Sequence, residues 1–339
     1  MGGVLVPLGR FNIRHDDNLW NLPRRSLVDR GVSVIPVKAA WPEVGAGFSG
    51  RFTVGEEGAI DYRLYVVNGA QFDFELEEIV QTRFPARSKL ELEAEFRPAK
   101  GTFSKDLKGD KSFTGRLNFS PVLGHEVAVS GYIGRYTPEV FKSMTVWSVG
   151  LDGLSTIGPF ELEYEYIYTN WGNIRKLTRS LAQVARERAR FIPSAASPLF
   201  EAEIEIEPAN LARVRHGYWV ELRYPFWPKF LARTFLGRHF ENPKLIPTLR
   251  WEQVFTDDLL DRVNFTGGVL TSFDTIDRTL NRITGGIALR PNPLWAFQLA
   301  LEYTWVNKAK SLLGLTNFLT PRAVDNDVFA VLFGVAFGF

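Results

Sequence analysis

The sequence contains no cysteine, and its 339 residues include only two methionines and four histidines. The absence of cysteine excludes disulfide bonds, zinc–thiolate sites and thiol nucleophiles together. Charge of one sign is not in excess, because 40 basic residues stand against 38 acidic ones. That balance gives no overall basic footprint for a nucleic-acid partner.

Long hydrophobic runs are also missing. The longest one, residues 328–337, has ten residues, whereas a transmembrane helix needs about 20. A helical membrane protein is therefore excluded, but a membrane β-barrel is not, because its strands need only about 9–11 residues each. The N-terminus lacks the basic region, apolar stretch and cleavage site of a secretory signal peptide. We therefore expect a processed or N-terminally truncated chain.

What the sequence does have is 27 phenylalanines and a strong alternation of side-chain type. In residues 328–339 every second position is bulky, as at Phe329, Phe333 and Phe337, and the positions between are mostly small. Successive side chains of a strand point to opposite faces, so this segment predicts a strand with one bulky face and one mostly small face.

Other segments alternate apolar with polar residues and place aromatic residues at the strand ends. Residues 295–305 put Trp295 and Trp305 at the two ends of an apolar row, with Gln298 and Glu302 on the other face. Aromatic ends with aliphatic residues between them are typical of a lipid-facing strand in a membrane barrel. A soluble β-sandwich is the alternative, but several long polar loops alternating with short turns are uncommon in compact soluble domains.

We therefore predict an all-β fold, a single transmembrane antiparallel β-barrel domain over residues 1–339, with twelve strands preferred. The expected strands are Val4–Phe11, Val44–Val54, Asp61–Asn68, Phe113–Phe119, Val127–Tyr136, Thr145–Leu151, Phe160–Tyr168, Tyr218–Phe226, Leu245–Phe255, Arg282–Leu289, Trp295–Val306 and Val328–Phe339. Two further alternating segments, 89–96 and 201–207, are interpreted as hairpin arms above the membrane. If they span it, or if upstream strands are missing, the count becomes 14–16. Asn12–Glu43 is expected to be a long external loop, and Trp227–Lys244 is too long for the short turn expected there.

The last eight residues, 332–339, resemble the C-terminal assembly signal of Gram-negative outer-membrane β-barrels. Gly334, Phe337 and Phe339 match that signal, whereas Leu332 stands where a polar residue is usual. Residues 4–12 are similar, over a much shorter match, to the strand that enters a long external loop in porins of the phosphate-selective type. The resemblance implies location in the cell outer membrane, with lipid, lipopolysaccharide and the barrel-assembly machinery as partners. It carries over no substrate-site residue.

The inward positions of the expected strands carry charges of both signs. The candidate pore-lining residues are Arg116, Glu161, Glu163, Glu165, Glu221, Arg223, Arg250, Glu252, Arg282 and Glu302. A water-filled pore would accommodate such charges, and rings of charge would tune its ion preference. The alternative is that most of them pair across strands and only fill the interior.

One helix is expected, over residues 173–190, from apolar residues at helical spacing. Its six basic residues and single acid, Glu187, give a net charge of +5. Folded into the mouth of the barrel, the helix would favour anions, with Arg179, Arg186 and Arg190 as the constriction residues. An external helix that binds lipopolysaccharide phosphates is the equal alternative.

These observations favour a porin for passive diffusion of ions and small hydrophilic solutes, with mild anion preference. The alternative is a non-conducting structural barrel that anchors or surrounds a partner protein. An enzyme is not expected, because His15, His125, His216 and His239 fall in four separate connections or strand ends and form no nucleophile–base pair. No cofactor or metal is expected, no nucleic-acid partner is expected, and a homo-oligomer is left open.

Deletion of Phe339 is expected to impair assembly more than conductance. A terminal aromatic residue on the last strand can sit at the membrane interface, and it completes the match to the assembly signal. The measurement is the yield of the truncated chain in the membrane, compared with its single-channel conductance. An unchanged yield would contradict the prediction.

Overall fold

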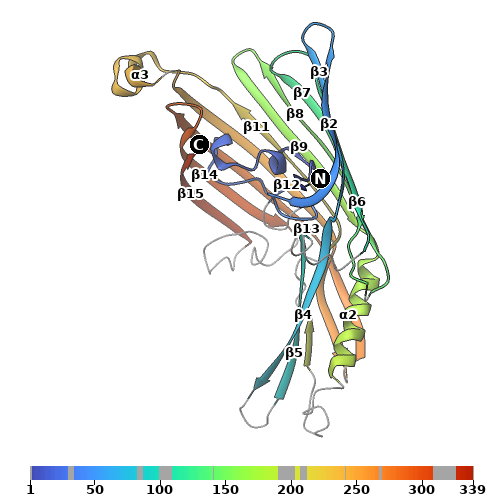
Figure 1. The fold of residues 1–339 in the computed structure, drawn as a ribbon. Coiled ribbons are helices and arrows are strands. Elements are labelled where there is room, and N and C mark those ends of the chain that lie inside the picture. Colours follow the sequence, from blue (N-terminus) through green and yellow to red (C-terminus); the bar gives the residue numbers. More distant parts are fainter. Residues whose placement is uncertain are drawn as a thin grey trace.

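The computed structural model describes residues 2–29, 34–81, 87–98, 109–139, 141–189, 203–206, 212–240, 242–266, 269–307 and 326–338. Its main feature is one twelve-stranded antiparallel sheet that curves around the N-terminal part of the chain (Figure 1). The side of the sheet that faces this part of the chain is called here the concave face, and the opposite side is called the convex face. Side chains alternate between the two faces along every strand.

The strands of the large sheet follow one another in chain order, with a few elements inserted between them. They are β1 (Gly2–Leu5), β2 (Pro42–Val54), β3 (Gly58–Val67), β6 (Ser112–Ser120), β7 (His125–Arg135), β8 (Thr145–Ile157), β9 (Phe160–Trp171), β11 (Ala212–Arg223), β12 (Lys244–Thr266), β13 (Val269–Arg290), β14 (Trp295–Asn307) and β15 (Asp327–Phe337). Each strand pairs antiparallel with its neighbours in this order. Within the described residues, no pairing joins the end strands β1 and β15.

The predicted count of twelve antiparallel strands is confirmed, but several of the predicted boundaries are wrong. β8 extends to Ile157 rather than Leu151, and β11 spans Ala212–Arg223 rather than Tyr218–Phe226. The strand expected over Val4–Phe11 ends at Leu5. Pro7 has no N–H to donate, and Gly9 with φ +75° turns the chain into the short helix α1 (Arg10–Ile13). The strands expected over Leu245–Phe255 and Arg282–Leu289 are longer than predicted, because residues 256–281 are mostly the paired outer part of the β12–β13 hairpin. Register shifts after Thr256, Leu260 and Asn264 interrupt the alternation that identifies a strand in the sequence.

A separate three-stranded sheet contains β4 (Ala70–Gln81), β5 (Arg87–Pro98) and β10 (Glu203–Ile206). β5 forms a hairpin with β4, whereas β10 pairs in parallel with β5, so the interpretation of the segment 201–207 as a hairpin arm is wrong. Both β5 and β10 nevertheless lie outside the large sheet, as predicted. The expected helix is confirmed as α2 (Ile174–Ala189), which lies beside β13 and β5 (Figure 1). Three shorter helices are η1 (Asp17–Leu19), η3 (Lys229–Arg233) and α3 (Phe235–His239). No helix in the described part of the chain is long and apolar enough to cross a membrane.

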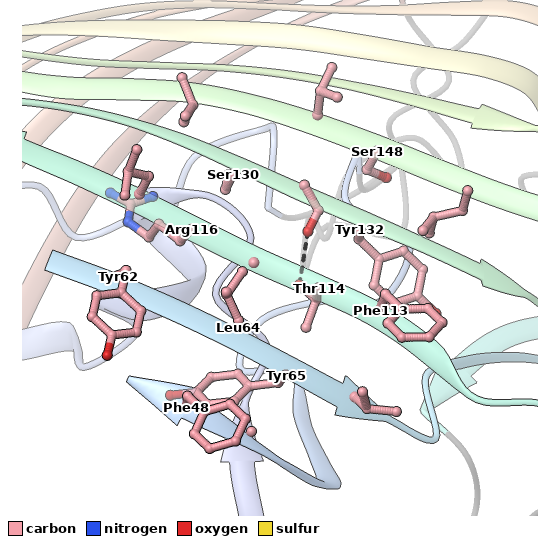
Figure 2. A pocket seen from close by; sticks show the side chains of 18 of the residues that line it. Phe48, Tyr62, Leu64, Tyr65, Phe113, Thr114, Arg116, Ser130, Tyr132 and Ser148 are labelled. Atoms are coloured by element: carbon pink, nitrogen blue, oxygen red, sulfur yellow. Dashed lines mark hydrogen bonds between the residues drawn. The ribbon is translucent and has the colours of Figure 1, made fainter. Parts of the chain in front are cut away.

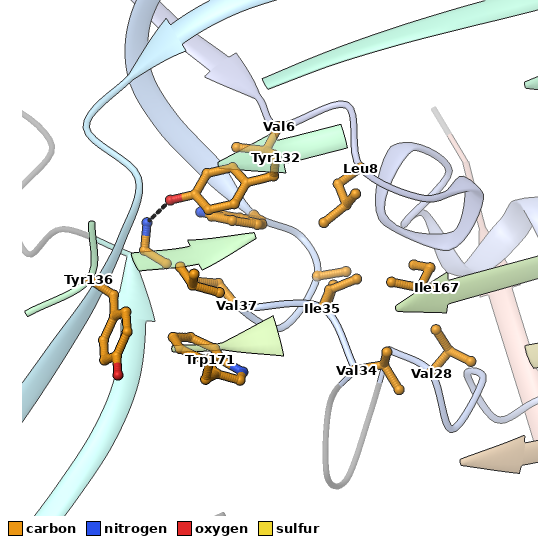
Figure 3. Close-up of a cluster of buried hydrophobic side chains, with 14 of the residues drawn as sticks. Val6, Leu8, Val28, Val34, Ile35, Val37, Tyr132, Tyr136, Ile167 and Trp171 are labelled. Carbon is orange, nitrogen blue, oxygen red and sulfur yellow. Dashed lines mark hydrogen bonds between the residues drawn. The ribbon is translucent and has the colours of Figure 1, made fainter. Parts of the chain in front are cut away.

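The hydrophobic core lies on the concave face, between the sheet and residues 6–41. Figure 3 shows Val28, Val34 and Ile35 of that segment close to Ile167 of the sheet, all of them buried. Tyr132 takes part as well, and its hydroxyl accepts a hydrogen bond from the backbone N–H of Ala70 at 2.8 Å. The sheet therefore packs around part of its own chain.

The convex face exposes apolar side chains over most of the sheet. The exposed residues include Phe48, Leu64, Phe113, Leu117, Val129, Leu222, Leu249, Leu299, Leu301, Val331 and Phe333. Figure 2 shows Phe48, Leu64 and Phe113 at an apolar hollow of about 1380 Å³ over β2, β3, β6, β7 and β8. Monomeric soluble proteins rarely expose contiguous apolar patches larger than a few hundred Å². An apolar face of this extent indicates a contact surface.

Aromatic residues gather at both ends of the convex face. At the end with the short turns, Phe160 contacts Tyr224 and Trp295 contacts Phe337, with ring centroids 5.2 and 5.1 Å apart. At the opposite end, Trp147 pairs with Tyr168 and Trp251 with Trp305, at 5.2 and 5.6 Å. The band between these two aromatic rows is mostly aliphatic, with Phe48 and Phe333 as exposed aromatic residues within it.

The buried core predicts a stability difference between two apolar truncations. Ile167→Ala, at a side chain with 0% exposure, is expected to lower the free energy of unfolding by about 2–5 kcal/mol. Leu123→Ala, at a turn residue with 98% exposure, is expected to change it by less than about 0.5 kcal/mol. Denaturant unfolding of both variants is the measurement, and equal destabilisation would contradict this account of the core.

Candidate functional site

The candidate site is the space between the concave face and the described residues 6–29 and 34–41, called here the inner segment. The backbone N–H of Val6 donates to the carbonyl of Trp41 at 3.0 Å, so the segment leaves and rejoins the sheet at one place. Asn12 joins the two ends of the segment at this place. Its Nδ2 donates to the Val6 carbonyl at 2.7 Å, and its Oδ1 accepts from the Trp41 N–H at 2.9 Å. The interpretation of Asn12–Glu43 as an external loop is therefore wrong. The loop folds inward (Figure 1) because its apolar residues need burial and the concave face offers charged partners.

An aromatic cluster around one arginine holds the first half of the inner segment. Phe11 and Trp20 stack with ring centroids 3.8 Å apart, and both meet the edge of Trp219 at 5.8 Å. The guanidinium of Arg250 lies 5.4–5.8 Å from the three ring centroids. Cation–π attraction is larger when both partners are desolvated, and Arg250 and Trp219 are both buried.

Glutamates of the sheet bind the inner segment, among them Glu163, Glu165 and Glu252. Glu163 accepts from Arg10 and, at 3.0 Å, from Arg14. Glu165 accepts the backbone N–H of Phe11 at 3.0 Å, and Glu252 accepts that of Leu27 at 3.0 Å. Carboxylates placed in this way satisfy backbone donors that the irregular segment cannot pair within itself.

Polar side chains of β13 and β14 bind the carbonyl groups of the same segment. Arg290 donates to the carbonyls of Asn18 and Trp20, each at 2.7 Å, and Gln298 also donates to Trp20 at 2.7 Å. Arg282 donates to the carbonyl of Arg25 at 2.5 Å. The segment is thus hydrogen-bonded to the sheet along much of its length.

The charges of the concave face are paired with one another as well. Glu163 lies directly opposite Glu221 across β9 and β11, an arrangement that is repulsive by itself. Arg223 binds both carboxylates, and Arg250 also binds Glu221, at 2.5 Å. Arg282 binds Glu252 and lies 3.6 Å from Glu302. A buried charge is costly without a partner, and this chain of ion pairs supplies one for each of these groups.

The ten candidate pore-lining residues all lie on the concave face. Arg116 binds Asp152 through both terminal nitrogens at 2.5 and 2.6 Å, Glu302 binds Arg24 at 2.6 Å, and Glu161 lies 3.8 Å from Arg223. Glu165 has a different environment, because it accepts from the Phe11 N–H and, at 3.2 Å, from the Trp219 indole. The alternative in which these charges pair and fill the interior therefore describes most of them.

The pairing is looser at the β2–β3–β6 side, where a polar cavity of about 760 Å³ lies between the sheet and the inner segment. Its lining includes five arginines and two carboxylates, namely Arg10, Arg14, Arg51, Arg63, Arg116, Asp61 and Glu126. Arg63 is exposed, and Arg51 is 3.7 Å from Asp61 with both side chains well exposed. Burial, together with the neighbouring Arg10, lowers the pKa of the Arg14 guanidinium from its usual value, although arginine stays protonated in proteins. Arg10, Arg14 and Arg116 are paired with Glu126, Glu163 and Asp152, so the positive charge exposed in this cavity comes from Arg51 and Arg63.

The other predicted site residues lie elsewhere. Arg179 is an exposed residue of α2, whose Leu177 and Leu181 are buried. The side chain of Arg186, and Arg190 and Phe339 as a whole, lie outside the described residues.

Two residues of the proposed assembly signal have contacts of their own. A Cβ added at Gly334 would lie 2.6 Å from Gln298 Oε1 and 3.0 Å from Pro23 of the inner segment, so a glycine fits best there. Phe337 packs edge-on against Trp295.

Sequence reasoning missed Arg10, Arg14 and Arg24, the inner-segment residues that pair with the sheet. A signal was present, because the expected loop Asn12–Glu43 combines Arg14 and Arg24 with buried-type residues such as Trp20 and Trp41, a composition that is unusual for a solvated loop. No protein-family model matches this chain, and no curated protein sequence matches it at a significant level.

The ion-pair chain predicts that removing one carboxylate is costly. Glu221→Gln leaves Arg223 and Arg250 short of a partner, and the free energy of unfolding is expected to fall by about 3–5 kcal/mol. The matched control is Glu56→Gln in the exposed β2–β3 turn, with an expected change within about 0.5 kcal/mol. Urea unfolding of both variants measures the difference, and a small effect at Glu221 would argue against a stabilising role for the chain.

Proposed function

We propose that the protein is an outer-membrane β-barrel channel for passive diffusion of ions and small hydrophilic solutes, with a mild preference for anions. The apolar convex face, bounded by two aromatic rows, supports a membrane placement, because membrane barrels present such a band to lipid. The sequence resemblance of residues 332–339 to an outer-membrane assembly signal points to the same compartment.

The observation that carries the channel proposal is the polar cavity beside the inner segment. The segment covers much of the concave face, and its ion pairs hold it there. The remaining polar space lies against β2, β3 and β6, with five arginines and two carboxylates in its lining. A solute path through this space would be narrow and positively charged. Walls of one charge sign raise the local concentration of ions of the opposite sign.

This placement shifts the proposed selectivity residues from the helix to the cavity. Most carboxylates of the sheet are engaged by arginines or by the inner segment, so they contribute little net field to the path. Arg51 and Arg63 face the cavity with exposed side chains. Arg179, Arg186 and Arg190 remain the competing candidates for the same role.

A non-conducting structural barrel is the second candidate function. The packing of the inner segment against the concave face favours it, because hydrogen bonds and ion pairs fix that segment over β9, β12, β13 and β14. In that case the barrel would anchor a partner protein, and its lipid-facing surface would be the same. Homo-oligomers are compatible with both functions.

The experiment is the reversal potential of the reconstituted protein in planar bilayers under a salt gradient. Arg51→Gln together with Arg63→Gln is expected to move the reversal potential towards zero, because two positive charges leave the solute path. The triple variant Arg179→Gln, Arg186→Gln and Arg190→Gln is the comparison, and it is expected to leave the potential unchanged. Raising the salt concentration should weaken the preference of the parent protein, since exposed charges are screened.

Three results would speak against this proposal. Cation preference of the parent protein would contradict the proposed selectivity. If only the triple variant of α2 changes the reversal potential, the arginines of α2 determine the selectivity instead of Arg51 and Arg63. A stably inserted protein without any conductance would favour the structural barrel.

A further inference from the structure

The connection between β11 and β12, residues 224–243, differs from the other connections at the same end of the sheet. The β2–β3, β8–β9 and β13–β14 connections are short turns of residues 55–57, 158–159 and 291–294. The β11–β12 connection instead contains η3 and α3, and Figure 1 shows α3 standing away from the sheet. Sequence reasoning identified this length as unexpected without giving a cause.

Aromatic side chains of this connection are left in solvent. Phe230 is 77% exposed and Phe235 is 65% exposed. Phe235 stacks on His239 with ring centroids 4.4 Å apart and meets the edge of Phe240 at 6.0 Å, so these rings form one small apolar cluster. Two large exposed rings on a projecting element indicate a contact surface.

The same connection carries most of the positive charge at this end. Through residue 244 it contains Lys229, Arg233, Arg238 and Lys244 against Glu241, a net charge of +3. The β2–β3 turn carries the acids Glu56 and Glu57, and the turns at 158–159 and 291–294 carry no charged residue. Aromatic rings combined with cations are the composition of elements that lie in a membrane interface.

The aromatic row of the convex face leads directly into this connection. Tyr224 packs against Phe160 at 5.2 Å and against Phe226 at 5.3 Å. Phe226 is joined to Leu245 by an isolated bridge at the base of the connection. The apolar surface that we place against lipid is therefore continuous with the base of the projecting element.

We propose that the β11–β12 connection binds the headgroup surface of the membrane and that its ligand is anionic phospholipid. The rings of Phe230 and Phe235 insert at the level of the headgroups, and Arg233, Arg238 and the two lysines bind lipid phosphates. This inference rests on the proposed membrane placement of the sheet. The connection would add an electrostatic contact with lipid to the hydrophobic contact of the convex face. The strength of this electrostatic contact would depend on the charge of the lipid headgroups.

The absence of cysteine in the chain allows one reporter to be placed at a time. Ala232→Cys, between the exposed rings, carries an environment-sensitive fluorophore and keeps both phenylalanines. The full chain is reconstituted into vesicles of phosphatidylcholine, with and without phosphatidylglycerol, that contain brominated acyl chains as quenchers. Phe333→Cys on the convex face and Glu57→Cys in the β2–β3 turn are the lipid and water references.

The label at position 232 is expected to be quenched in vesicles that contain phosphatidylglycerol, and less so in phosphatidylcholine alone or at high salt. Phe230→Ser with Phe235→Ser, or Arg233→Gln with Arg238→Gln, should return it to the unquenched level seen at position 57. These four residues are partly or largely exposed, so the fold should not depend on them.

Two results would overturn the inference, and they are distinguishable. A quenched label at 333 with an unquenched label at 232 would leave the membrane placement standing and assign the connection to a protein partner. Unquenched labels at both positions would contradict the membrane placement together with this inference.

Discussion

The structure depends on one constraint: charged groups buried on the concave face of the sheet must have partners. Glu163 and Glu221 face each other across two strands, and Arg223 relieves their repulsion. The sheet alone does not complete the pairing, because Arg10 and Arg24 come from the inner segment. A buried carboxylate without its arginine would cost several kcal/mol. The inward fold of the inner segment and the charge pattern of the sheet therefore depend on each other, because each supplies ion-pair partners to the other.

The pairing of charges on one face only gives the two faces of the sheet different physical roles. The concave face combines ion pairs with a hydrophobic core, so it holds the inner segment by directional contacts as well as by burial. The convex face exposes apolar side chains between two aromatic rows. We interpret the first face as the wall of a narrowed lumen and the second as a surface for lipid. Both interpretations depend on the same strict alternation along each strand.

The inner segment is also what separates the two proposed functions. If the polar cavity beside β2, β3 and β6 is continuous across the membrane, the segment acts as a constriction, and the arginines of the cavity determine which ions pass. If it is not continuous, the same segment acts as a filling of the lumen. The proposed lipid contact of the connection between β11 and β12 is compatible with either function, because attachment to anionic lipid needs no open pore.

The sequence by itself determined the strand number, the antiparallel class, the helix α2 and the face of each strand that carries charge. Period-2 alternation is a local property, so residues such as Phe333 and Glu302 can be assigned to opposite faces without knowledge of their neighbours. The long hairpin of β12 and β13 escaped this reasoning, because register shifts break the period within it.

Only the tertiary structure decided where the loop of residues 6–41 lies and which charges it neutralises. Its contacts join residues far apart in the chain, such as Arg24 and Glu302, and no local pattern encodes such a pairing. Burial also decided that most wall charges are engaged while Arg51 and Arg63 at the cavity stay exposed. The balance between desolvation and ion pairing depends on three-dimensional surroundings, which a sequence pattern does not contain.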